Sequence, residues 1–155
     1  MKYIKDQENL RDKIILLRLD LNVPLKDGLV TDETRIDKIL PVINFLIQKE
    51  TRVLIVSHVG RPRGFHRTDL SLEPICKNLG GKINKKIRFV KENIYKLKKE
   101  NLFKKSSDKI ILLENIRFYS DEEENNSNFA SHLAKLADLY VNDAFSCSHR
   151  AHASV

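Results

Sequence analysis

Polar side chains suited to binding an anion follow four separate apolar runs of the chain. The apolar runs occupy residues 14–17, 53–56, 110–113 and 139–141. The polar residues close behind them are Asp20 and Asn22, His58 and Arg61, Arg117, and Asn142, Asp143, His149, Arg150 and His152. Because a guanidinium offers paired donors that match carboxylate or phosphate oxygens, this set indicates a site for a small, multiply charged anion.

Arginine, rather than the more abundant lysine, accompanies these runs. The chain has 18 Lys and 10 Arg, yet the cations expected near the site are Arg35, Arg61, Arg117 and Arg150. One alternative is that these arginines form structural ion pairs with Asp20, Glu114 and Asp143. We favour the anion site, because four arginines at one edge exceed what structural pairing there requires.

The apolar runs themselves predict the fold. Near-continuous branched apolar residues are typical of parallel strands covered by helices on both faces. We predict strands at 13–20, 52–57, 86–90, 109–113 and 138–141. We also predict a helix capped by Thr31 or Asp32 and helices spanning 71–81, 93–105 and 128–136. This alternation predicts an α/β fold with a doubly wound, Rossmann-like parallel sheet. The carboxyl ends of parallel strands share one edge, so the polar clusters are expected to meet there.

Three local features carry predictions of their own. Asp27 and Gly28 predict a tight turn. Pro41 predicts a kink in the first helix, because proline removes a backbone donor. The strand at 86–90 is expected near an edge of the sheet, and residues 121–126 are expected to form an acidic loop.

Length and composition fit one cytoplasmic domain. The chain has 155 residues, of which 41% are hydrophobic, enough for a substantial core. Cys76 and Cys147 form no CxxC pair, and the N-terminal residues contain no apolar segment of signal-peptide length. No apolar stretch approaches the roughly 20 residues that cross a bilayer. These features predict a reduced, cytoplasmic protein with no membrane partner.

The net charge of +7 raises the question of a nucleic-acid partner. Residues 77–109 hold 12 Lys or Arg against three acidic residues, so the surplus charge lies away from the strand-end clusters. Few aromatic residues accompany these lysines, which favours a solvated surface over a nucleic-acid interface. The alternative of binding nucleic acid predicts a steep dependence on salt.

Motifs for nucleotide and metal binding are absent from the sequence. There is no GxGxxG, no GxxxxGK[ST] and no GxSxG elbow. His149 and His152 have a spacing that suits a metal, but the sequence places no third ligand beside them. We therefore expect no metal site and no cofactor on this chain.

The sequence resembles the phosphoglycerate kinase family along essentially its whole length. The matching motifs are RLDLNVP at 18–24, TRI at 34–36, SHVGRP at 57–62, LENIRF at 113–118, and NDAF at 142–145 followed by HRAHAS at 149–154. The chain departs from the family pattern at Leu21, usually Phe, at Val59, usually Leu, and at 146–148.

The resemblance implies roles for particular residues. Asp20 and Asn22 would hold the glycerate end of 3-phosphoglycerate, and His58, Arg61, Arg117 and Arg150 would form a basic patch on its phosphate and carboxylate. The backbone at Leu21, Val59 and Gly60 would line the same pocket. Arg35 would be catalytic, approaching the transferring phosphoryl group and stabilising its charge.

The resemblance also implies a domain assignment. Residues 1–155 would be a truncated N-terminal, 3-phosphoglycerate-binding domain, without the half that binds Mg-ATP or Mg-ADP. The complete family enzyme, usually monomeric, transfers a phosphoryl group from 1,3-bisphosphoglycerate to ADP in glycolysis. The chain alone is expected to be inactive, and its partner would be the nucleotide-binding half. The alternative is a non-catalytic module that binds phosphoglycerate or another anion.

Overall fold

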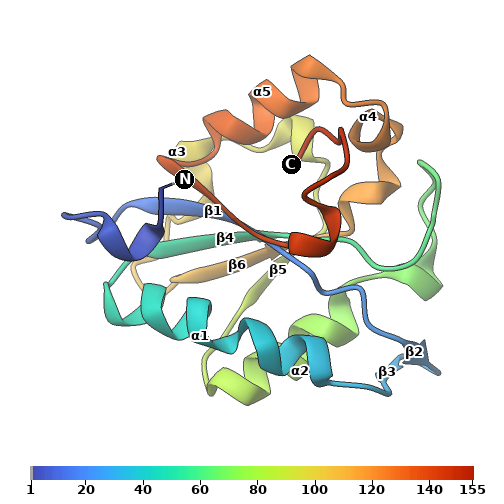
Figure 1. Ribbon diagram of the computed structural model, residues 1–155, viewed down its shortest axis with the longest axis horizontal. Coiled ribbons are helices and arrows are strands. Elements are labelled where there is room, and N and C mark those ends of the chain that lie inside the picture. The colour runs from blue at the N-terminus through green and yellow to red at the C-terminus, as the bar shows by residue number, and fades with distance from the viewer. Residues whose placement is uncertain (1) are drawn as a thin grey trace.

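A five-stranded parallel sheet forms the centre of the computed structural model, which describes residues 2–155 (Figure 1). The strands lie in the order β5-β6-β4-β1-β7. Their bounds are β1 (Ile14–Leu19), β4 (Arg52–Val56), β5 (Arg88–Val90), β6 (Ile110–Leu113) and β7 (Leu139–Asp143). All pairings in this sheet are parallel, so the predicted doubly wound α/β fold is confirmed, as is the edge position of β5.

Helices cover both faces of the sheet. In Figure 1, one face carries α1 (Thr34–Gln48) and α2 (Glu73–Ile83), and the opposite face carries α3 (Lys99–Leu102), α4 (Ser120–Glu123) and α5 (Ser127–Lys135). Successive side chains of a strand point to opposite faces. Accordingly Ile15 belongs to the core beneath α1 and α2, whereas Leu16 belongs to the core that includes Phe129 of α5. Both faces of the sheet are buried against apolar side chains, which explains the continuous apolar runs.

The carboxyl end of β1 leads into a small hairpin. Strands β2 (Leu25–Lys26) and β3 (Leu29–Val30) pair antiparallel around Asp27 and Gly28. Both turn residues have positive φ, 50° and 73°, as the favoured two-residue hairpin turn requires. The predicted turn is confirmed, although the strands beside it were too short to be predicted.

Several predicted boundaries are wrong. Residues 93–105 form no single helix but a 3-10 turn at Ile94–Lys96 and α3, because the Asn93 side chain caps the first turn and the backbone then becomes extended. Helix α2 runs past Gly80 and Gly81 to Ile83 and ends at Asn84 in the left-handed region. The acidic loop contains α4. Helix α1 runs from Thr34 to Gln48 with Pro41 inside it.

The Lys-rich stretch 77–109 is partly neutralised by ion pairs. Lys82 contacts Glu33 and Asp37, and Lys91 contacts Glu73 with Nζ and Oε2 2.9 Å apart. Most other lysines of the stretch are exposed. This arrangement agrees with a solvated surface, and the absence of a nucleic-acid partner stays a prediction. None of the helices within residues 2–155 has the length and apolar character to cross a membrane.

Candidate anion-binding site

A cavity of about 250 Å³ lies where the predicted polar clusters meet. Its lining residues are Asp20, Asn22, Arg35, His58, Gly60, Arg61, Arg117, Ser146, Cys147 and Arg150. Eight of the ten residues to which the family resemblance gives a place in the site are among them, whereas Asn142, Asp143, His149 and His152 of the fourth polar cluster are not. Ser146 and Cys147 were not predicted, and their only signal was their position between two of the matching motifs.

Leu21 and Val59 do not line this cavity. Both side chains are buried in the core beneath α1 and α2. The backbone N–H of Leu21 donates to Ser57 Oγ at 3.0 Å, and the carbonyl of Val59 accepts from Asn115 Nδ2 at 2.8 Å. These two backbone groups are thus engaged within the protein, and the predicted role of the Leu21 and Val59 backbone in binding a ligand stays a prediction.

Asp20 connects three segments of the site. Arg35 Nη1 donates to Asp20 Oδ1 at 3.1 Å and to the carbonyl of Asn22 at 3.0 Å. Ser146 Oγ donates to the other carboxylate oxygen of Asp20 at 2.7 Å. The Asn22 side chain accepts from the N–H of Gly60 at 2.9 Å. The ion-pair alternative is therefore correct for Arg35, which is half-exposed and held beside Asp20.

The other three arginines of the cavity have no such partner. Within residues 2–155, Arg61, Arg117 and Arg150 form no ion pair. Arg117 is only 5% exposed, and its Nε is buried with no hydrogen-bond acceptor. Burial lowers the pKa of Arg117 from its usual value. Because a buried, unpaired charge is costly, its presence at a cavity indicates a place for an anion.

Glu114 and Asn115, which precede Arg117 in the sequence, hold this arginine and the neighbouring loop in place. Asn115 Oδ1 accepts from the N–H of Arg117 at 3.0 Å, and Asn115 Nδ2 donates to the carbonyls of Val59 and Leu70. The Glu114 carboxylate accepts from Ser71 Oγ at 2.6 Å and from the N–H of Leu72. Glu114 therefore anchors the loop after β4 and is not an ion-pair partner of the site arginines.

His58 contributes a neutral ring to the cavity. Burial is the largest cause that lowers its pKa, to about 2, and the charges of Arg117, Arg18 and Arg150 act in the same direction, as does His152. Its Nδ1 lies 3.0 Å from Nη2 of Arg18. The site thus combines four guanidinium groups, one carboxylate and an uncharged imidazole.

This neutral histidine predicts a loss of stability in acid. The unfolded chain takes up a proton at His58 as the pH falls below about 6.5, whereas the folded chain does so only near pH 2. Stability from this residue is thus present above pH 6.5 and is lost as the pH falls. At about 1.4 kcal/mol per pH unit, the free energy of unfolding is expected to drop by about 2–3 kcal/mol between pH 6.5 and 4.5.

Urea unfolding at these two pH values measures the drop. Carboxylates also titrate in this range, so the matched comparison is His58→Gln, which cannot take up the proton. The variant is expected to lose about 2–3 kcal/mol less than the original chain over the same interval. Equal losses in the two proteins would contradict a neutral His58.

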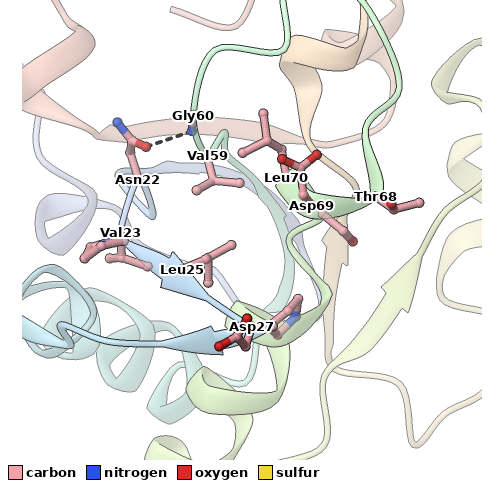
Figure 2. Close-up of a pocket in the computed structure, with 13 residues that line it drawn as sticks. Asn22, Val23, Leu25, Asp27, Val59, Gly60, Thr68, Asp69 and Leu70 are labelled. Carbon is pink, nitrogen blue, oxygen red and sulfur yellow. Dashed lines mark hydrogen bonds between the residues drawn. The ribbon is translucent and has the colours of Figure 1, made fainter.

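A larger cavity adjoins the site and differs from it in character (Figure 2). It measures about 690 Å³ and shares Asn22 and Gly60 with the anion cavity. Its lining mixes apolar side chains such as Leu25 and Leu70 with the carboxylates of Asp27 and Asp69, and no Lys or Arg lines it. Its size therefore does not make it the anion site.

A metal centre is not assembled from the described residues. No group of three His, Cys, Asp or Glu within residues 2–155 is placed to hold a metal ion. His149 is exposed, and His152 Nδ1 is buried without a hydrogen-bond partner.

Comparison with protein families gives one match that covers nearly the whole chain. Residues 4–155 match the family model described as phosphoglycerate kinase. The chain is 47% identical over 147 residues to a phosphoglycerate kinase of Wolbachia sp. subsp. Drosophila simulans. It is 48% identical over 147 residues to that of Dictyoglomus turgidum. Each match covers 95% of this chain and 37% of the relative.

Solved structures agree with the sequence matches. The structure of phosphoglycerate kinase from Coxiella burnetii superimposes with a TM-score of 0.86 at 37% identity, covering 97% of this chain and 37% of that chain. The enzyme from Pyrococcus horikoshii gives a TM-score of 0.85 at 29% identity, covering 99% and 39%. The chain thus spans less than two fifths of the length of these relatives.

Proposed function

The chain belongs to the phosphoglycerate kinase family, and from this premise we propose that its anion cavity binds 3-phosphoglycerate or the acyl phosphate 1,3-bisphosphoglycerate. The observation that carries the proposal is the set of unpaired arginines around the cavity, above all the buried Arg117. Family membership alone does not assign a ligand to these residues, whereas the charge and size of the cavity support one.

The charges of the cavity complement this ligand. Four guanidinium groups face one carboxylate, Asp20, and His58 is neutral. A phosphate monoester carries about −1.5 to −2 at pH 7, and the carboxylate of 3-phosphoglycerate adds one more negative charge. The cavity of about 250 Å³ is smaller than the roughly 300–1,000 Å³ of sites for drug-sized ligands, which favours a small metabolite over a nucleotide.

We assign roles to the lining residues on the same grounds. The buried Arg117, with Arg61 and Arg150, would bind the phosphate and carboxylate, since paired guanidinium donors suit both groups. Asp20 and Asn22 would hold the hydroxyl of the glycerate. Arg35 is half-exposed beside Asp20 and would stabilise charge on a phosphoryl group brought to it.

The rest of the reaction would require a second part of the enzyme. Phosphoryl transfer between a nucleotide and the acyl phosphate depends on Mg²⁺ and on donors aimed at the nucleotide phosphates. We propose that the nucleotide-binding half supplies these groups and that residues 1–155 form the 3-phosphoglycerate-binding domain. In that arrangement this chain positions one reactant, and no cofactor binds to it directly.

Two arginines of one loop provide a matched test of the proposed site. Arg61 and Arg63 are both exposed, but only Arg61 lines the cavity. Arg61→Gln is expected to weaken binding of 3-phosphoglycerate by about 1.5 kcal/mol, or about tenfold, because a charged hydrogen bond is lost. Arg63→Gln should leave the affinity almost unchanged. Titration calorimetry measures both, and equal effects of the two substitutions would remove the assignment of Arg61.

A further inference from the structure

Arg18 lies on β1, an interior strand of the sheet between β4 and β7, and is completely buried. Its side chain is 0% exposed, and within residues 2–155 it forms no ion pair. The guanidinium donates from Nη1 to the carbonyl of Leu19 at 2.7 Å and from Nε to Ser154 Oγ at 3.0 Å. Its Nη2 lies 3.0 Å from Nδ1 of His58. Arg18 does not line the anion cavity, so it acts on the site through its neighbours.

The contact with Arg18 determines which nitrogen of His58 carries the proton. A guanidinium has donors and no acceptor, so Nδ1 of His58 must accept the hydrogen bond. In a neutral ring the proton is then on Nε2. His58 lines the anion cavity. Because Nδ1 is engaged in the core, Nε2–H is the ring donor that remains for an anion.

A second buried charge helps to hold Arg18. Ser154 Oγ accepts from Arg18 Nε and donates to the carboxylate of Glu122, and the N–H of Ser154 donates to Glu122 Oε2 at 3.0 Å. Glu122 is itself fully buried. Burial raises the pKa of its carboxyl, while the hydrogen bond from Ser154 and the charge of Arg18 oppose the rise. One hydroxyl thus links the two buried ionisable groups, and each reduces the cost of burying the other.

We propose that Arg18 is a positioning residue that fixes His58 as the Nε2–H tautomer, with Ser154 and Glu122 holding Arg18 in place. The inference rests on the proposed function, because the benefit of this tautomer is a hydrogen bond to the phosphate or carboxylate of phosphoglycerate. A neutral Nε2–H donates to an oxyanion, whereas an unprotonated Nε2 would present a lone pair and repel it.

Nitrogen NMR of the ligand-free 155-residue chain, with His58 assigned through His58→Gln, reports the tautomer directly. The original chain is expected to show a single Nε2–H form at pH 7. In Arg18→Met, His58 is expected to show a mixture of tautomers, and the affinity for 3-phosphoglycerate is expected to fall about tenfold. The matched control is Arg52→Met on β4, because Arg52 is another arginine of an interior strand, is partly buried, and makes no contact with His58. Arg52→Met should change neither the tautomer of His58 nor the affinity for 3-phosphoglycerate.

A second variant decides the question if Arg18→Met does not fold. Ser154→Ala removes one hydroxyl and frees Arg18 Nε, so it is expected to shift the tautomer in the same direction, with a few-fold loss of affinity. An Nδ1–H form in the original chain, or an unchanged tautomer in whichever variant folds, would overturn the inference. If the tautomer shifts but the original chain does not bind 3-phosphoglycerate, the proposed function fails and the positioning role stands.

Discussion

Supplied with Mg-ATP and 3-phosphoglycerate, the purified 155-residue chain is expected to bind the phosphoglycerate but to show no phosphoryl transfer. The reaction requires donors and Mg²⁺ on the nucleotide phosphates, whereas the arginines proposed to bind the anion surround a cavity of about 250 Å³ sized for the other reactant. The chain also spans only 37% of the relatives from Wolbachia and Dictyoglomus that carry the name of the whole enzyme. A coupled assay that detects ADP formation measures the transfer.

The same experiment separates the two functions left open by the sequence. Adding a nucleotide-binding half in trans is expected to restore some turnover if this chain is the phosphoglycerate-binding part of a kinase. Binding without any restored turnover would favour a non-catalytic anion-binding module. Turnover by the chain alone at ordinary enzyme rates, which have a median near 10 s⁻¹, would contradict the proposed division of labour.

Replacing Arg117 by Met is expected to have opposite effects on binding and on stability. The affinity for 3-phosphoglycerate should fall by about 3 kcal/mol, or about 150-fold, because a buried guanidinium no longer binds the anion. The free energy of unfolding without ligand should stay the same or rise, since Arg117 is 5% exposed and its Nε has no acceptor. Met keeps the apolar stem and removes the uncompensated charge. Calorimetry and urea unfolding measure the two quantities.

Arg88 provides the matched control for this prediction. It is only partly buried, whereas Arg117 is buried, and it contacts Asp108 with Nε and Oδ2 3.2 Å apart and lies away from the cavity. Arg88→Met should therefore lower stability and leave the affinity for phosphoglycerate unchanged. If Arg117→Met destabilised the ligand-free chain as Arg88→Met does, Arg117 would be a structural residue and not a binding one.

The strands and the meeting of the polar clusters were predictable because both depend on a local pattern. Continuous apolar runs mark strands buried on two faces, and parallel strands bring their carboxyl ends to one edge. The burial and hydrogen-bond partners of individual side chains were not predictable from such a local pattern. Arg18 stands in the first matching motif, yet its burial against His58 depends on Ser154, which is 136 residues distant. Likewise, Leu21 and Val59 neighbour lining residues but point into the core.

The interior position of β1, between β4 and β7, has a consequence for how the protein folds. This strand is synthesised first, but it pairs with β7 on one side, and Ile14 N–H donates to Asp138 Oδ2, 124 residues away. Contacts between such distant segments give a high contact order and slow folding. On the ribosome, β1 must wait for residues near 140 before its hydrogen bonds are complete. Arg150 and Ser154 join the site at the same stage, so ligand binding would report the completion of folding and would stabilise only the finished sheet.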